Sequence, residues 1–197
     1  MEQILGRLFT IIVAALFVNN FVLARFLGLC SFIGISTRTD VAIGMSMALT
    51  FVVTFSSAIT WPINHFLLVP FHLEYLNIIT FILVVASSVQ FTEMFIKKFN
   101  QALYKALGIY LPLITVNCIV LFVTLLNVQS RLSFLESVVQ GFSAGVGYSL
   151  ALFLMSCIRE RLETAPVPRS LKGAPLAFII AGLMSLAFLG FAGLMVE

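Results

Sequence analysis

Residues 26–34 carry the sequence FLGLCSFIG and lie inside a long apolar run that starts near Leu8. The stretch holds one cysteine, Cys30, and two glycines, Gly28 and Gly34. Glycine lowers helix propensity by about 1 kcal/mol relative to alanine, so a helix through this run is weakened on both sides of the thiol. A cysteine in apolar surroundings usually packs as a small hydrophobic residue. The stretch therefore predicts a weakened helix and leaves open whether the thiol has a chemical role.

The composition of the chain is that of an integral membrane protein. Of its 197 residues, 61% are hydrophobic and only 10% are charged, whereas a soluble domain carries about 25% charged residues. The apolar runs are too continuous for barrel strands, in which side chains alternate. We therefore expect an all-α bundle of about six helices in contact with membrane lipid. The net charge of +3 does not indicate nucleic acid, because most of the basic residues lie in short loops.

Six membrane spans are predicted within a single membrane domain, residues 1–197. They cover residues 8–35 (interrupted), 41–61, 76–96, 103–126, 134–158 and 174–196. Eight of the 11 lysine and arginine residues fall in the loops after the first, third and fifth spans. Cytoplasmic loops carry such an excess of basic residues, so both termini are expected on the periplasmic side of a bacterial inner membrane.

The six spans divide into two inverted three-helix repeats, about residues 1–100 and 101–197. Three spans per half give the halves opposite orientations, and such repeats place functional sites near the bilayer midplane on broken helices. Cys30 and Cys118 both lie deep in the first span of their half. Both of these spans contain residues that weaken or break a helix, namely Asn19, Asn20, Arg25 and Gly28 in one and Gly108, Pro112 and Asn117 in the other. The first helix of each repeat is thus predicted to be broken.

The repeat relation suggests that Cys30 and Cys118 act together, whereas Cys157 has no repeat partner and is expected to pack inertly. Thiolates suit iron–sulfur clusters, zinc or copper(I). Two thiolates cannot complete a four-cysteine [2Fe–2S] site, and His65 and His72 lie in an outer loop about half a bilayer away. If a cluster exists, a second chain must supply the remaining ligands. Inert packing of both cysteines is the alternative.

Several long motifs resemble a known family. They are NNFVLARFLGLCSFIGIS, VQFTEM, LYKALGIYLPLITVNCIV, IRERLE and AGLMSLAFLGFAGL. Together they are similar to the A-type subunit of Rnf electron transport complexes, which are membrane-bound ferredoxin:NAD oxidoreductases. A close relative is the E-type subunit of the sodium-pumping NADH:quinone reductase, Nqr. The resemblance covers essentially the whole chain, and Asn19, Asn20 and Arg25 favour the Rnf branch.

The resemblance implies a role in electron transport. Family members pair with a homologous sister subunit of opposite topology, which in Rnf is the E-type subunit, and share a [2Fe–2S] cluster with it near the membrane centre. Each member of the pair gives two cysteines, which correspond here to Cys30 and Cys118. Electrons would pass between a cytoplasmic iron–sulfur subunit and a periplasmic FMN-bearing subunit. The complex, a translocase, couples this transfer to Na⁺ or H⁺ movement, and the chain itself is expected to have no catalytic site.

An anionic cluster inside the membrane needs hydrogen-bond donors, because the hydrocarbon interior disfavours bare charge. Backbone N–H groups of Gly28 and Leu29, before Cys30, and of Val116 and Asn117, before Cys118, are candidates. Such hydrogen bonds tune reduction potentials. The alternatives are close helix packing at Gly28 and an interhelical hydrogen bond from Asn117.

Two charged residues within the spans are further candidates. Arg25 either acts on the cluster electrostatically or contacts another subunit, or it has a structural role such as snorkelling toward the interface. Glu93 either pairs with a lysine of the Lys97–Lys98 loop or serves ion uptake, as the matching acid does in related sodium-pumping subunits. The rival function classes are a secondary transporter or ion-conducting subunit without redox chemistry, which broken inverted repeats fit equally well, and a structural scaffold.

Overall fold

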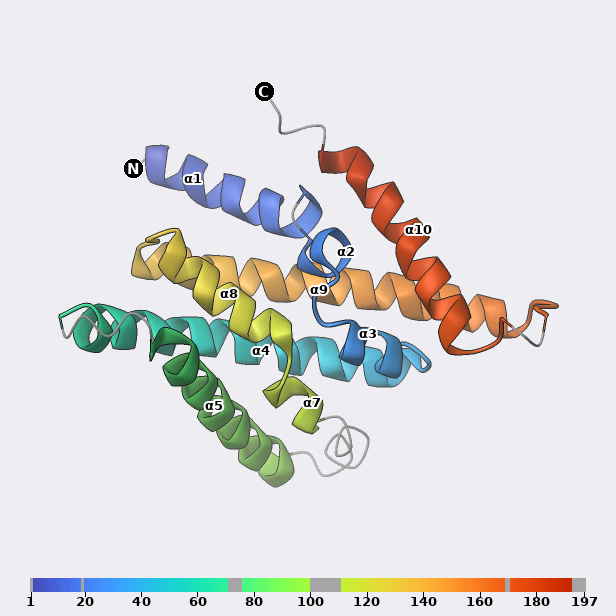
Figure 1. Cartoon of the computed structure of the whole chain (residues 1–197), viewed down its shortest axis with the longest axis horizontal. Coiled ribbons are helices and arrows are strands. Elements are labelled where there is room, and N and C mark those ends of the chain that lie inside the picture. Colours follow the sequence, from blue (N-terminus) through green and yellow to red (C-terminus); the bar gives the residue numbers. More distant parts are fainter. Residues whose placement is uncertain (1, 19, 71–75, 100–110, 169–170, 193–197) are drawn as a thin grey trace.

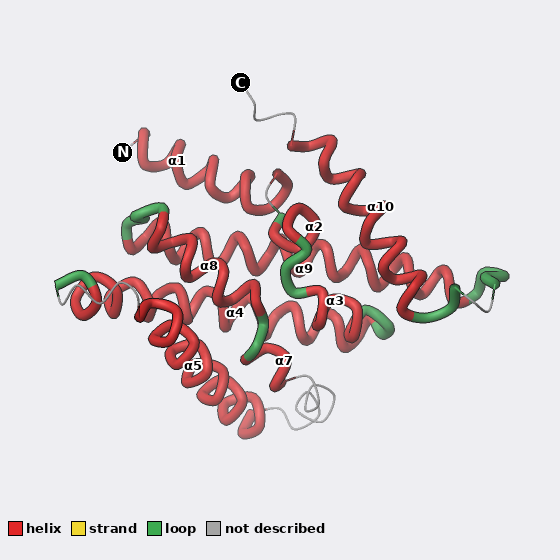
Figure 2. Tube along the Cα trace, in the orientation of Figure 1, coloured by secondary structure: helices red, strands yellow, loops and turns green. Residues whose placement is uncertain are grey.

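The computed structural model describes residues 2–18, 20–70, 76–99, 111–168 and 171–192, and its regular structure in these ranges is all helical, as predicted (Figures 1 and 2). Two π-helical turns, Ala14–Val18 and Asn64–Leu68, continue α1 and α4. The helices are α1 (Glu2–Val13), α2 (Phe21–Arg25), α3 (Leu29–Ile35), α4 (Thr39–Ile63), α5 (Asn77–Phe99), α7 (Leu111–Thr115), α8 (Cys118–Gln129), α9 (Phe134–Glu163) and α10 (Ala174–Ala192).

Two long helices, α4 and α9, form the centre of the molecule and make its most extensive helix–helix contact (Figure 1). Small residues of α9 allow the close approach. A Cβ atom on Gly145 would lie 2.7 Å from the Cα of Thr50, and one on Gly141 would lie 2.6 Å from the Oγ of Ser57. The Thr50 and Ser149 hydroxyls are 3.2 Å apart across the same contact. Glycine thus acts here as it does in other membrane helix pairs, by bringing two backbones together.

The start of α9 is fixed by a capping box. The Ser133 backbone N–H donates to Oε2 of Glu136 at 3.0 Å, and Glu136 also forms an ion pair with Arg7 of α1 at 3.3 Å. The other end of α9 runs to Glu163, beyond the predicted boundary at residue 158. There Arg159 donates to the Ile33 carbonyl at 2.7 Å, which ties this end of α9 to the end of α3.

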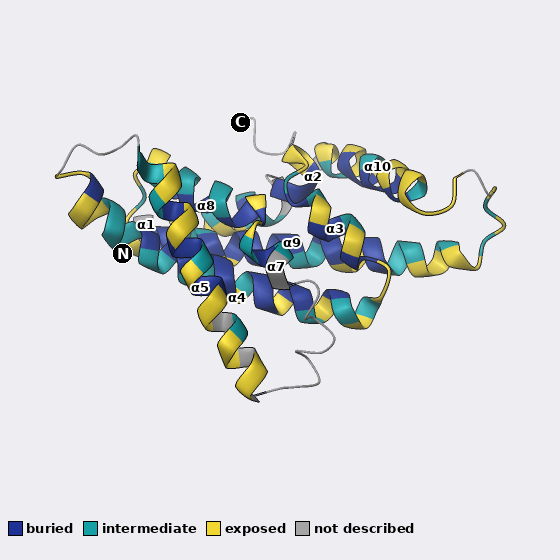
Figure 3. Cartoon of the chain, turned by 60° about the horizontal axis from the view of Figure 1, so that its bottom comes forward, coloured by how far each residue is buried: buried dark blue, intermediate teal, exposed yellow. Residues whose placement is uncertain are grey.

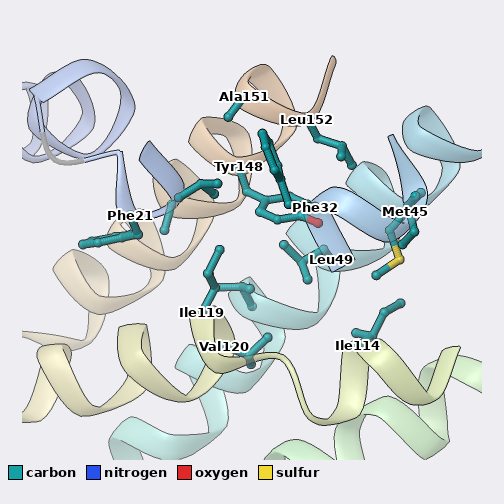
Figure 4. Close-up of a cluster of buried hydrophobic side chains, with 14 of the residues drawn as sticks. Phe21, Phe32, Met45, Leu49, Ile114, Ile119, Val120, Tyr148, Ala151 and Leu152 are labelled. Atoms are coloured by element: carbon teal, nitrogen blue, oxygen red, sulfur yellow. The ribbon is translucent and has the colours of Figure 1, made fainter. Parts of the chain in front are cut away.

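The buried core lies where α3, α4, α8 and α9 meet (Figures 3 and 4). Its largest fully buried side chains include Tyr148, Phe32, Met45, Leu49 and Ile119. Outside this core, α5 and α10 turn large apolar side chains outward, among them Ile79, Leu83, Phe91, Leu183 and Leu186. Apolar surface of this extent marks contact with a partner or a membrane.

Three of the described helical segments are long and apolar enough to cross a membrane, Thr39–Leu68, Asn77–Phe95 and Phe134–Glu163. They correspond to the second, third and fifth predicted spans. Shorter apolar helices cover Gly6–Leu16, Leu113–Gln129 and Ala174–Gly190. The first predicted span is divided among α1, α2 and α3, and the first part of the fourth, with Gly108, lies outside the described residues. Six spans in two inverted repeats, and the orientation of the termini, stay predictions.

Candidate functional site

The first helix break separates α2 from α3 (Figure 2). The chain leaves α2 through Phe26, which has φ 53°, and enters α3 through Gly28, which has φ 77°. Both values lie in the left-handed region that glycine adopts most easily. The Phe26 N–H donates back to the Phe21 carbonyl and closes the end of α2. The break is therefore a defined turn with its own hydrogen bond.

Gly28 is required at this turn for a second reason. A Cβ atom at this position would lie 2.9 Å from Cδ1 of Ile119 and 3.2 Å from Oδ1 of Asn117. The close helix packing expected as an alternative role for Gly28 is therefore present, together with the left-handed backbone. Both demands exclude a larger residue at the same position.

The second break separates α7 from α8 at Val116 and Asn117. Asn117 caps α8, because its Oδ1 accepts from the Ile119 N–H at 3.1 Å. Its own backbone N–H donates to the Ile114 carbonyl at 3.2 Å. That N–H is therefore already used within the turn. Asparagine is a preferred N-cap residue, so the sequence explains why α8 starts here.

Asn20 repeats this arrangement at the start of α2. Its Oδ1 accepts from the Val22 N–H at 3.2 Å, and its amide donates to the Gly147 carbonyl of α9 at 2.8 Å. Both asparagines are buried. Each one therefore caps the helix that follows it and anchors that helix to a neighbour.

The two breaks bring Cys30 and Cys118 to one place. Cys30 is the second residue of α3, Cys118 is the first residue of α8, and both are exposed. The Gly28 backbone N–H donates to the Sγ of Cys118 at 2.9 Å, so the turn before one cysteine touches the other. Among the described residues, no group of three or more His, Cys, Asp or Glu side chains gathers to hold a metal.

A buried hydrogen-bond network lies directly beneath the two breaks. Ser31 is its centre, with its Oγ 3.0 Å from the Tyr148 hydroxyl and 3.0 Å from the Gly28 carbonyl oxygen. The Asn117 amide donates to the same Oγ at 3.0 Å, which is the interhelical bond considered from the sequence. Figure 4 shows the Tyr148 side chain reaching from α9 into the cluster that contains Phe32 and Leu49. The network therefore joins α3, α8 and α9.

Comparison with known proteins identifies the family. The profile of the Rnf-Nqr subunit family, described as a membrane protein, matches residues 8–195. The chain belongs to the Rnf-Nqr family. Proteins named as the A-type subunit of an ion-translocating oxidoreductase complex, from Shewanella sediminis, Shewanella putrefaciens and Shewanella oneidensis, are each 55% identical to it over 184 residues. That alignment covers 93% of this chain and 96% of each relative, so the resemblance to the A-type Rnf subunit is confirmed.

The remaining predicted site residues of this Rnf-Nqr chain are less closely grouped. Leu29 is half-buried at the start of α3, and Val116 is 73% exposed. Arg25 is exposed at the end of α2, and its guanidinium lies 5.0 Å from the ring centroid of Phe122. Phe122 in turn packs edge-on against Phe21. A cation over an aromatic face is a structural contact, and it gives Arg25 a partner that the sequence did not suggest.

Glu93 is far from both helix breaks in the sequence, and it lies on α5, which borders neither break along the chain. It is half-buried on α5, one turn before Lys97. Cys157 is half-buried on α9. His65 stacks on Trp61 with ring centroids 5.0 Å apart, while His72 and Asn19 lie outside the described residues.

Sequence reasoning missed Ser31 and Tyr148. Ser31 follows Cys30 directly, but a serine in an apolar helix ordinarily bonds to its own backbone. Tyr148 is one aromatic residue among many in a predicted span. The only available signal was a polar group on the buried face of each helix, because such groups need partners in a membrane.

Proposed function

We propose that the chain is the A-type component of an Rnf-type ion-translocating oxidoreductase complex and relays electrons across the membrane through a [2Fe–2S] cluster. The names of its 55% identical relatives support the complex. The observation that carries the relay is the meeting of Cys30 and Cys118, which come from two different helix breaks, with a backbone N–H already donated to one of their sulfurs. Packing alone does not require two exposed thiols at one place.

The residues present fit half of such a site. Cys30 and Cys118 would provide two soft thiolate ligands, and a four-cysteine cluster requires two more. Because both thiols are exposed, a homologous sister subunit of the E type can approach them. Phe26 is 48% exposed and Val116 is 73% exposed beside them, and these side chains offer an apolar rim for that contact. When bound, the cluster would accept and release one electron.

The role of this chain is to hold the sulfurs and shield them. The hydrocarbon core is about 30 Å thick, and a site near its middle would divide one long electron transfer into two shorter ones. The Gly28 N–H stabilises negative charge on the Cys118 sulfur, since hydrogen bonds to sulfur favour the charged form. The buried core of α3, α8 and α9 excludes water from the inner side of the site. Partner iron–sulfur and FMN-bearing subunits would exchange the electrons, and the complex would couple this exchange to the movement of Na⁺ or H⁺.

Spectroscopy of the purified complex, or of this chain with its sister subunit, tests the proposal. We expect a reducible [2Fe–2S] signal in paramagnetic resonance that disappears in Cys30→Ser and in Cys118→Ser. The Cys157→Ser variant is the matched control and should keep the signal, because Cys157 is half-buried elsewhere on α9. An unchanged signal in all three variants would exclude the relay. Ion transport that persists without Cys30 and Cys118 would favour the non-redox alternative.

A further inference from the structure

The hydrogen atoms of the buried network beneath the cysteines can be assigned by counting donors and acceptors. Asn117 Oδ1 accepts from the Ile119 N–H, so its amide group must be the side that donates to Ser31. A serine hydroxyl has one hydrogen and two lone pairs. The Ser31 hydroxyl gives its hydrogen to the Gly28 carbonyl, which can only accept. The Tyr148 hydroxyl must then donate to Ser31, and every hydrogen-bonding position of the serine is filled.

The network ends on the same peptide turn that touches the second cysteine. Gly28 receives the Ser31 hydroxyl at its carbonyl oxygen and gives its N–H to Cys118 Sγ. The Phe32 N–H also donates to that carbonyl, at 3.0 Å. Since Gly28 has φ 77° and no side chain, its orientation depends on these bonds. Ser31, Asn117 and Tyr148 are all almost completely buried, so water cannot replace a missing partner.

We propose that Tyr148, acting through Ser31, is a positioning residue that holds the Gly28 N–H on the Cys118 sulfur and thereby sets the reduction potential of the site. The second part of this inference rests on the proposed function, whereas the first concerns only the chain itself. Tyr148 lies on α9 and Asn117 at the start of α8. The network therefore makes the contact at sulfur depend on how α3, α8 and α9 are packed.

Hydrogen exchange of the full-length chain in detergent tests the positioning. In protein labelled with ¹⁵N-glycine, the Gly28 signal is the one that shifts in Cys118→Ser. We expect Tyr148→Phe to speed exchange at Gly28 roughly fivefold to tenfold, the factor for losing one buried hydrogen bond. Ser31→Ala removes three hydrogen bonds and should speed this exchange at least as much. Gly141 and Gly145, at the contact of α4 and α9, should not change. Ser143→Ala is the matched control, because this buried α9 hydroxyl donates to the Val139 carbonyl of its own helix, at 2.7 Å.

A redox titration of the assembled complex tests whether Tyr148 sets the reduction potential of the site. Hydrogen bonds to sulfur favour the reduced cluster, so Tyr148→Phe should lower the ratio of reduced to oxidised cluster at fixed potential about tenfold, a shift of about 59 mV in the reduction potential. A general packing role would instead speed exchange at Gly28, Gly141 and Gly145 together, and that result overturns the positioning. Unchanged exchange at Gly28 in Tyr148→Phe also overturns the positioning. A complex that carries no cluster refutes the proposed function, while the exchange data still decide whether Tyr148 holds Gly28.

Discussion

Replacement of Gly28 by alanine is the sharpest test of how the first helix break is built. Alanine at φ 77° would occupy the left-handed region, which costs a residue with a Cβ atom roughly 1–2 kcal/mol. Its Cβ would also lie 2.9 Å from Cδ1 of Ile119, and relief of such overpacking costs about 1 kcal/mol or more. We therefore expect Gly28→Ala to lower the free energy of unfolding by about 2–3 kcal/mol.

Gly34→Ala is the matched control, because Gly34 lies inside α3, the short helix that Gly28 precedes, and a Cβ there would have no atom within 4 Å. Alanine is favoured over glycine inside a helix by roughly 0.5–1 kcal/mol, so this variant should gain stability. The two variants should then differ by about 3 kcal/mol. Unfolding in mixed micelles, titrated with SDS and followed by circular dichroism, measures this difference.

A double-mutant cycle separates the two parts of the cost. Ile119→Val removes Cδ1, the atom nearest to the added Cβ, so in its background Gly28→Ala should cost about 1 kcal/mol less. The part that remains is the cost of the left-handed backbone and of the contact with Oδ1 of Asn117 at 3.2 Å. If Gly28→Ala proved as harmless as Gly34→Ala, neither the turn geometry nor the packing assigned to Gly28 would be correct.

Three further predictions concern the asparagines, the arginine and the orientation. Asn117→Ala loses an N-cap and a buried hydrogen bond and should lower the free energy of unfolding by about 2 kcal/mol. Asn20→Ala should cost as much in the same SDS titration but keep the [2Fe–2S] signal that depends on Cys30 and Cys118. Arg25→Gln should destabilise less than either, because its contact with Phe122 is exposed; a larger loss would indicate an unseen partner. A reporter fused to the C-terminus should show activity on the periplasmic side alone. Activity on the cytoplasmic side would overturn the prediction that the C-terminus faces the periplasm.

The helix breaks could be predicted because their causes are local. Gly28 and Asn117 change the backbone at their own positions, through weak helix propensity and capping. The pairing of Cys30 with Cys118 was predicted from their equivalent places in the two proposed repeats. These signals need no knowledge of how helices cross.

The network under the cysteines could not be predicted, because its cause is tertiary. Ser31 and Tyr148 are separated by 117 residues, and they meet only when α3 and α9 pack together in the folded chain. The extension of α9 beyond the predicted boundary to Glu163 also involves tertiary contacts, since Arg159 donates to the Ile33 carbonyl and the Ser36 hydroxyl at the end of α3. Sequence periodicity shows which face of a helix is buried, but it does not show which polar groups on two such faces will touch.

The helix breaks before Cys30 and before Cys118 are not equivalent, although the proposed repeats place them at corresponding positions. In the first half the turn has two left-handed residues, Phe26 and Gly28, and its peptide N–H reaches across to Cys118. Exact symmetry would place a donor from the second turn on Cys30, yet the Asn117 N–H is bonded to the Ile114 carbonyl. The side chain of Asn117 instead supports Ser31, and through it Gly28. Both halves therefore stabilise one contact, the hydrogen bond from the Gly28 N–H to the Cys118 sulfur.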